Sequence, residues 1–397
     1  MMNNLQPKDL TLHINNKIAE LEPHLIAIRR DIHSHPELGF DTIRTADIVR
    51  SELEKMGYQP KTGIGRTGVQ LDISGGAAGP TLLLRADMDA LPMQEQTGLP
   101  YASQIAGKMH ACGHDLHTAT LLGVAATLKD LTPQLKGNVR LIFQPAEETA
   151  ESGAAAMIVD GAADGIDMAI TLHNKPELQA GRIALTRGAS TASSDEFDVT
   201  VKGMSTHAAR PHMGRDPIIA AVGLITQLQT IISREADPAD SAVLTIGHIA
   251  GGTTHNIIPD SCMFQGTVRA RSKERRDQIE AAFRRICNGF AQAMEVEISL
   301  NYQRGVPPLI NDEHLIDQIE GILSQHFGER IEATSKSSFG AEDFSYFTER
   351  VPGCQIEFGS AIAGRHDHLH NSDYQPDEAC ITVGAIALSR IAVDLLS

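Results

Sequence analysis

Tryptophan is absent from this chain, and aromatic residues make up only 4% of its 397 residues. Proteins that stack bases or sugar rings use such side chains, so the usual platforms for these ligands are missing. Cationic residues are in the minority, since 34 Lys and Arg stand against 50 Asp and Glu, for a formal net charge of −16. This charge repels phosphate backbones, and no cluster of Lys and Arg outweighs it locally. We therefore expect no nucleic-acid partner.

Long apolar runs and regularly spaced cysteines are lacking as well. No apolar run approaches the length that crosses a bilayer, and the first twenty residues have neither the basic nor the apolar region of a secretion signal. The five cysteines are scattered and odd in number, which fits reduced thiols better than a disulfide framework. These features predict a cytoplasmic protein that does not associate with membranes.

The first half of the chain alternates between strand-like and helix-like segments. Residues 16–56 have helical periodicity that His35-Pro36 interrupts, and four short apolar runs follow at 69–73, 81–84, 139–143 and 168–172. Helix-like stretches separate these runs, which predicts an α/β fold with a mostly parallel sheet. Polar motifs come just past three of the runs, and the carboxyl ends of parallel strands meet at one crevice. We expect the chemistry to lie there.

The pattern changes near residue 190. Strand-like alternation at 197–201, 243–249, 263–270 and 296–300, with helical runs at 218–233 and 273–294, gives the order β-α-β-β-α-β of a ferredoxin-like unit. Residues 304–308 form an exit linker, and α/β character returns afterwards. We predict a catalytic domain of residues 1–190 and 304–397, into which an α+β domain of residues 191–303 is inserted.

Four side chains between residues 112 and 148 form most of a metal site. Cys112 and His114 can bind a cation from one turn, and Glu147-Glu148 follows a buried-looking strand. A thiolate, an imidazole and a carboxylate are competent ligands, and a second carboxylate can take a proton from a bound water. The alternative is a buried thiol beside a solvated His, with a solvated pair of acids. The position of the acids beyond a strand favours the site, because buried carboxylates need a compensating cation.

Two further histidines complete the set of possible ligands. His173 follows the fourth run, and His370 lies in a His-rich segment that could otherwise be an exposed polar loop. Together the chain offers Cys, His, Glu, His and His with one additional Glu, about what two metals that share a bridging water require. This set predicts metal-assisted hydrolysis. A non-catalytic structural zinc site is the competing interpretation, and Glu147, an acid in addition to the ligands, argues against it. A nucleotide-using enzyme is disfavoured because no Gly-x-Gly-x-x-Gly loop follows a first strand.

Seven motifs resemble one known family over nearly the whole chain. They occur in this order: Arg85–Pro92, Met109–Asp115, Phe143–Glu148, His173-Asn174, Gly203–Ala209, Gly251–Pro259 and the His370 region. The chain is thereby similar to the co-catalytic metallopeptidases that include aminoacylases, hippurate hydrolases, N-acetyldiaminopimelate deacetylases and auxin-conjugate (IAA-amino acid) hydrolases. The segment after Glu148 departs from many relatives, in which this connection is shorter and Gly-rich.

The resemblance implies a role for individual residues. It implies that two divalent ions (Zn, Mn, Co or Ni) are bound by Cys112, His114, Glu148, His173 and His370. It makes Glu147 the general base and Asp89 an acid that orients a ligand histidine. It also implies a homodimer or higher oligomer in which the inserted domain acts as a dimerisation and lid domain. His207 of that domain would reach the partner's site and stabilise the oxyanion, and Asn256 would contact the substrate.

An N-acyl amino acid is the expected substrate. Its carboxylate needs a cationic or hydrogen-bonding anchor, and Arg210, Arg269 and Asn256 of the inserted domain are available, although either Arg could be a plain surface charge. The acyl group is left open among acetyl, benzoyl and longer chains. A dipeptidase or carboxypeptidase of the same fold is the alternative, and it is distinguished by a requirement for a free α-amino group.

Overall fold

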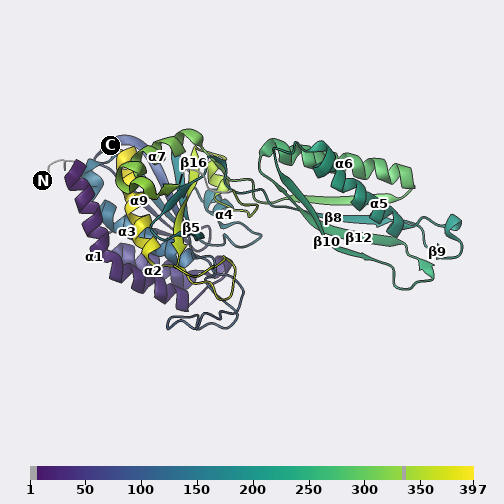
Figure 1. Ribbon diagram of the computed structural model, residues 1–397, viewed down its shortest axis with the longest axis horizontal. Coiled ribbons are helices and arrows are strands. Elements are labelled where there is room, and N and C mark those ends of the chain that lie inside the picture. Colours follow the sequence, from purple (N-terminus) through teal and green to yellow (C-terminus); the bar gives the residue numbers. More distant parts are fainter. Residues whose placement is uncertain (1–6, 333–336) are drawn as a thin grey trace. The chain divides into compact units, whose positions relative to one another are not determined.

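The computed structural model describes residues 7–332 and 337–397, which form two compact units (Figure 1). Unit 1 comprises the described residues of Met1–Gly188, Ile310–Lys336 and Tyr346–Ser397, and unit 2 comprises Ala189–Leu309 and Ser337–Ser345. The first six residues, part of the stretch assessed for a secretion signal, lie outside the described residues. The predicted domain limits of 1–190 with 304–397, and of 191–303, stay a prediction.

Unit 1 is built on an eight-stranded sheet of order β1-β2-β4-β3-β5-β16-β6-β15. The strands are β1 Lys61–Ile64, β2 Gly68–Ser74, β3 Ala77–Asp87, β4 Lys136–Gln144, β5 Met168–Gln179, β6 Ile183–Leu185, β15 Ile331–Glu332 and β16 Gly353–Ala361. The four central strands β4, β3, β5 and β16 are parallel, whereas β2 runs antiparallel to β4. The predicted α/β class with a mostly parallel sheet is confirmed.

Helices cover this sheet, and the apolar core of unit 1 lies between them and the strands. They are α1 Pro7–Ser34, α2 Ile43–Lys55, α3 His114–Leu131, α4 Gly153–Val159, α7 Glu313–Phe327 and α9 Ala379–Leu395. Leu82, Leu84 and Ala86 alternate along β3 and join one apolar core with residues of α1, α2, α3, α7 and α9. Every residue of α3 except Lys129 and Asp130 is buried, because α1, α9 and the strands of the sheet all pack against this helix. The amino end of α3 is therefore held rigidly, and the predicted ligands Cys112 and His114 lie there.

Unit 2 is a four-stranded antiparallel sheet of order β10-β12-β8-β13. The strands are β8 Asp195–Lys202, β10 Ala242–Gly251, β12 Ser261–Ala270 and β13 Glu297–Arg304, and the helices are α5 Pro217–Thr230 and α6 Lys273–Met294. Both helices lie over the same face (Figure 1), where Phe197, Val199 and Val201 of β8 point into their shared core. Asp216 and Ser272 cap the two helices with their side-chain oxygens. This is the predicted ferredoxin-like order.

Short elements connect the main ones. They are β7 Gly188–Ala189, β9 Thr206–His207, β11 Ile257–Ile258, β14 Ile310–Asn311, α8 Ser345–Thr348, the 3₁₀ turns η1 Gly39–Asp41, η2 Thr132–Gln134, η3 Pro211–Met213 and η5 Gly328–Arg330, and the π-helical turn η4 Ile231–Glu235. β9 pairs with β11 in unit 2, and this small ladder carries His207.

One apolar helix is longer than the sequence analysis predicted. The run Pro217–Glu235, which joins α5 to η4, is long and apolar enough by length and composition to cross a membrane, with a mean hydropathy of 1.2. About a third of an 18-residue stretch of this run (33%) is buried. Its buried residues include Ala220, Ala221 and Leu224, which belong to the core of unit 2. A helix in the core of a globular domain meets the same criterion of length and composition, so this run does not by itself indicate a membrane span.

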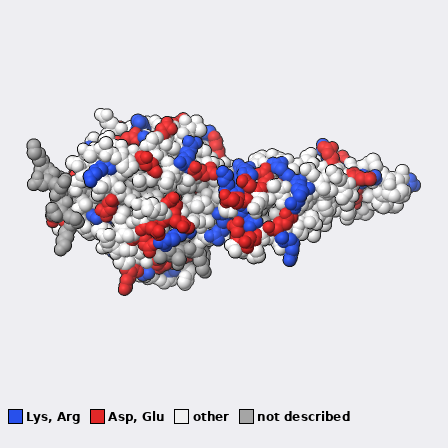
Figure 2. All heavy atoms as spheres, turned by 90° about the horizontal axis from the view of Figure 1, so that it is seen from above, with Lys and Arg blue, Asp and Glu red and all other residues white. Residues whose placement is uncertain are grey.

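Most charged side chains along α6 are paired with opposite charges. Arg284 contacts Glu280 at 2.7 Å, and Arg304 at the end of β13 contacts Asp277 at 2.6 Å. Blue and red side chains are correspondingly interspersed on the face drawn in Figure 2. Each exposed pair contributes at most about 1 kcal/mol to stability, because solvent screens it.

Candidate metal centre

Cys112 and His114 lie on the tight turn that begins α3. Gly113 between them has a φ of +88°, and a Cβ at this position would lie 2.3 Å from Asn174 Nδ2. Only glycine fits this backbone conformation and this close approach. The turn places Cys112 Sγ 3.5 Å from His173 Nε2.

His173 lies inside strand β5 and not just past a strand as predicted. Main-chain pairing of β5 with β16 continues through this residue, which lies opposite Glu357. His173 Nδ1 donates a hydrogen bond to the carbonyl oxygen of Asn174 at 2.7 Å. Because Nδ1 carries the proton, Nε2 has a free lone pair that faces Cys112.

Glu148 lies between the histidines His114 and His370. Its Oε1 lies 3.0 Å from His370 Nε2 and 4.0 Å from His114 Nε2. His370 has a left-handed backbone with a φ of +60°, and its N–H donates to the carbonyl oxygen of Ala111 at 2.9 Å. The structure thus brings together all five residues predicted as ligands. Their ligand atoms form overlapping triads within 4.8 Å, which are Cys112/His114/His173, Cys112/Glu148/His370 and His114/Glu147/Glu148.

Buried polar atoms without well-aligned hydrogen bonds show that this arrangement fits cations. Both ring nitrogens of His114 and Oε1 of Glu148 are buried without a well-aligned hydrogen bond among the described residues, although each lies within 4.0 Å of a group of opposite charge. Burial alone lowers the pKa of His114, but the negative charges of Asp87, Asp89 and Glu148 outweigh it and raise that pKa to about 10. An excess of buried negative charge around such an imidazole is what a divalent cation compensates.

The thiol of Cys112 is protonated when no cation compensates its surroundings. Burial raises its pKa well above the usual value, and the charges of Glu148, Glu147 and Asp87 raise it further. Only a thiolate ligates strongly, so cation binding at Cys112 must release this proton.

Asp89 holds the segment that carries both acids. Its two carboxylate oxygens accept the backbone N–H groups of Glu147 at 3.0 Å and Glu148 at 3.1 Å, and Oδ1 lies 3.5 Å from His114 Nδ1. The predicted role of Asp89 was to orient a ligand histidine. That role stays a prediction, and the hydrogen bonds show that Asp89 fixes the main chain of the candidate base.

Asp87 and His117 are residues that sequence reasoning missed. His117 Nδ1 lies 2.5 Å from Asp87 Oδ1, and His117 Nε2 accepts the backbone N–H of Asn174 at 2.9 Å. Burial lowers the pKa of His117 to about 4, so the ring is neutral. Asp87, His114 and His117 could form a metal triad by distance, but both His117 nitrogens are already engaged. The signal in the sequence was the i, i+3 spacing of His114 and His117 on one helix face.

A second buried cluster lies beside the site, around Asp115. Asp115 Oδ2 is 2.7 Å from Arg29 Nε and 2.8 Å from His33 Nδ1, which ties α1 to the first turn of α3. His110 is buried next to this cluster, and neither ring nitrogen has a partner among the described residues. Burial lowers the pKa of His110 to about 3.

Stability should therefore depend on pH through His110. As the pH falls below about 6.5, the unfolded chain binds a proton at this His that the folded chain does not, so folded His110 costs stability in acid. The free energy of unfolding of the metal-free protein should fall, relative to that of His110→Leu, by up to about 1.4 kcal/mol per pH unit between pH 6 and pH 4. Urea unfolding at several pH values measures the difference. Parallel curves for the two proteins would contradict it.

Unit 2 carries the four residues predicted to contact the oxyanion or the substrate, and three of them, His207, Arg210 and Asn256, lie together. Ala208 N–H donates to the carbonyl oxygen of Asn256 at 3.1 Å, and Arg210 N–H donates to that of His207 at 2.7 Å. The exposed ring of His207 accepts the Ala209 N–H on Nδ1 at 3.0 Å. Arg269 is near the other end of β12, where it pairs with Val243. A strand rises about 3.3 Å per residue, so Arg269 lies roughly 26 Å along β12 from Ser261, the first residue of that strand.

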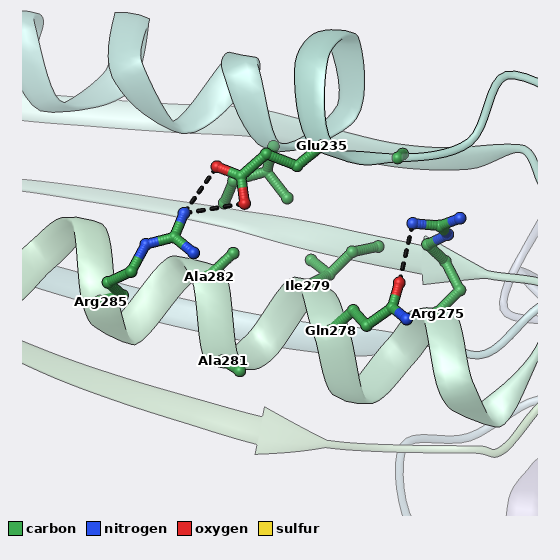
Figure 3. Close-up of a pocket in the computed structure, with 9 residues that line it drawn as sticks. Glu235, Arg275, Gln278, Ile279, Ala281, Ala282 and Arg285 are labelled. Carbon is green, nitrogen blue, oxygen red and sulfur yellow. Dashed lines mark hydrogen bonds and ion pairs between the residues drawn. The ribbon is translucent and has the colours of Figure 1, made fainter.

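A pocket of about 550 Å³ in unit 2 has a different character (Figure 3). Glu235 at the end of η4 binds Arg285 of α6 at 2.6 and 2.8 Å, and Arg275 donates to Gln278 at 2.9 Å. The nine described residues that line it include no His or Cys. Glu235 and Arg285 neutralise each other, and Arg275 is paired with Asp240 outside the pocket at 3.0 Å, so the pocket has no group of imidazole and thiol ligands like that of the metal centre.

Comparison with known proteins agrees with this geometry. The model of peptidase family M20/M25/M40 matches residues 83–394. The chain is 43% identical over 379 residues to an N-acetyl-L-cysteine deacetylase of Bacillus subtilis (strain 168), covering 96% of this chain and 90% of the relative. It is 38% identical over 384 residues to a hippurate hydrolase of Campylobacter jejuni, and the match covers 96% of this chain and 98% of that relative.

Among solved structures, a dinuclear metal binding peptidase of the M20 family from Bacillus subtilis superposes with a TM-score of 0.84. It is 34% identical, and the match covers 95% of this chain and 99% of that one. The chain therefore belongs to peptidase family M20/M25/M40 and is a metal-dependent hydrolase of amide bonds.

Proposed function

We propose that this enzyme cleaves the amide bond of N-acyl amino acids, releasing a carboxylic acid and a free amino acid. The observation that carries the proposal is the group of buried ligand atoms on His114 and Glu148 that lack a well-aligned hydrogen bond, beside a second carboxylate, Glu147. The deacetylase and the hippurate hydrolase named above are both called after N-acyl amino acids, which supports the substrate class.

Two divalent ions would be held by Cys112, His114, Glu148, His173 and His370, with Zn, Mn, Co and Ni as candidates. When bound, such ions lower the pKa of an attacking water and polarise the amide carbonyl. The first triad, Cys112/His114/His173, and the second, Cys112/Glu148/His370, share Cys112. This sharing supports a site for two ions side by side.

Glu147 would perform both proton transfers. Its carboxylate takes a proton from the attacking water, and it then gives that proton to the departing nitrogen, because an amide does not expel an unprotonated amine at neutral pH. The two N–H bonds from its segment to Asp89 hold this base at the edge of the site. His207 donates to the oxyanion, and Asn256, Arg210 and Arg269 anchor the substrate, with its carboxylate at the cationic side chains.

The enzyme would act as a homodimer joined through unit 2, so that His207 serves the site of the other copy. Two features support a second copy as the partner. β10 is an edge strand of its sheet, and an uncovered edge invites pairing. The outer face of α5 exposes Ile219 and Val222, at 60% and 50% of their surface. We further propose a cytoplasmic enzyme, since none of the five cysteines, all among the described residues, is in a disulfide.

A substrate panel tests the proposal. N-acetyl and N-benzoyl amino acids should be hydrolysed by protein that holds two divalent ions per chain, whereas dipeptides with a free α-amino group should be poor substrates. Chelation should abolish hydrolysis, and Zn, Mn, Co or Ni should restore it, as followed by amine release and elemental analysis. Full hydrolysis by metal-free protein would refute the metal mechanism. A preference for dipeptides would replace the substrate class by that of a dipeptidase.

A further inference from the structure

Asn174 makes more connections at the metal centre than any role given so far explains. This residue follows His173 in β5 and is 3% exposed. Its backbone N–H donates to His117 Nε2 at 2.9 Å, and its side-chain Nδ2 donates to the carbonyl oxygen of Cys112 at 2.5 Å. Its Oδ1 accepts hydrogen bonds from Ser360 Oγ at 3.1 Å and from the hydroxyl of Tyr374.

These contacts fix the orientation of the amide. Nδ2 faces two acceptors, the Cys112 carbonyl and His117 Nε2 at 3.2 Å, and Oδ1 faces two hydroxyl donors. A rotated amide would place one carbonyl oxygen against another at Cys112. Both ends of the side chain are thus satisfied in only one orientation.

The partners of Asn174 belong to segments that carry ligands. Cys112 offers its carbonyl from the same residue whose thiol faces the site. Tyr374 is fully buried, and its N–H donates to the carbonyl oxygen of Asn371 at 3.1 Å, which closes a turn directly after His370. One amide therefore links the main chain at Cys112, the strand at His173 and the turn beyond His370.

We propose that Asn174 is a positioning residue that sets the spacing of Cys112, His173 and His370 before a cation binds. This inference rests on the ligand set of the proposed function. Ligands in one preset arrangement lose less conformational freedom on binding, so the affinity for the cation is higher. The residue itself touches neither the cation nor the substrate.

Asn174→Ala tests this inference by direct titration of metal-free protein with Co²⁺, in which thiolate-to-cobalt absorption reports binding at Cys112. Removal of an outer hydrogen-bond partner typically costs about 10–100-fold in metal affinity, and we expect a loss in that range. At saturating Co²⁺ the absorption band should return, and KM for an N-acetyl amino acid should stay within about twofold of the wild type, because no substrate contact is lost.

The chain offers a matched control in Asn311. This Asn is also buried, at 1%, and bridges main-chain groups, donating to Thr186 at 2.8 Å and accepting from Gln355 at 2.9 Å. Asn311→Ala should lose comparable stability in urea while keeping wild-type Co²⁺ affinity. If it weakens Co²⁺ as much as Asn174→Ala does, the effect is general loosening and the inference fails.

A milder variant guards against failure to fold. Tyr374→Phe removes one hydroxyl and should weaken Co²⁺ binding several-fold in a folded protein. If Asn174→Ala folds and binds Co²⁺ with wild-type affinity, the positioning role is overturned. If Asn174→Ala does not fold, wild-type Co²⁺ affinity in Tyr374→Phe would overturn it. Failure of the wild-type chain to bind two Co²⁺ with the thiolate band would instead refute the proposed ligand set.

Discussion

Glu147→Gln should lower kcat by about 10²–10⁴-fold while both cations stay bound. The substitution keeps the size of the side chain, and the backbone N–H of residue 147 can still donate to Asp89, but an amide cannot accept the proton of the attacking water. KM should change little, because the base acts in the transition state. Steady-state hydrolysis of an N-acetyl amino acid, together with elemental analysis of the same sample, measures both quantities.

Glu148→Gln is the matched comparison on the neighbouring residue. Glu148 Oε1 lies 3.0 Å from His370 Nε2, so loss of its charge should loosen the cation between them. This variant should lose metal as well as activity, and added metal should restore part of the activity. If Glu147→Gln loses metal and Glu148→Gln keeps it, the two roles are reversed.

Mixing two inactive variants, Glu147→Gln and His207→Ala, should restore activity. In a hybrid dimer one site has an intact Glu147 and receives His207 from the other chain, so each hybrid should show about half the wild-type rate. Each parent should be weak, since loss of one oxyanion donor typically costs about 10²–10³ in kcat. Activity measured before and after subunit exchange gives the result.

The control for this experiment is His207→Ala mixed with the double variant Glu147→Gln/His207→Ala. Its hybrids contain no intact His207, so they should stay inactive. Exchange is verified with dimers of different mass. Verified hybrids of the two single variants without recovered activity would mean that His207 does not act across the dimer.

Local patterns predicted the elements well where periodicity and caps agree. The run 273–294 was predicted from its apolar spacing, and α6 is Lys273–Met294, with Ser272 as its cap. The runs at 139–143 and 263–270 lie within β4 and β12. The direction of β2 could not be predicted, because alternation along one strand does not say whether its neighbour is parallel to it.

The candidate ligands were predicted from the sequence, whereas most of the residues that hold them in place were not. Cys and His are residue types that commonly bind metals, so Cys112 and His173 could be identified as candidate ligands from the sequence. Asn174 was not given a role, because its partners Ser360 and Tyr374 are 186 and 200 residues away. The position of His173 inside β5 was likewise missed, since pairing with β16 and not local composition extends that strand.

The ligands rest on segments of unequal local stability. His173 is in β5, which is paired on both sides, with β3 and β16. His370 is in a turn, and 52% of its side chain is exposed. Opening of such a turn costs less free energy than opening of a central strand, so hydrogen exchange should be fast at residue 370 and slow at residue 173. A cation can then leave on the His370 side while the sheet stays intact, and a chelator can strip the enzyme without denaturing it.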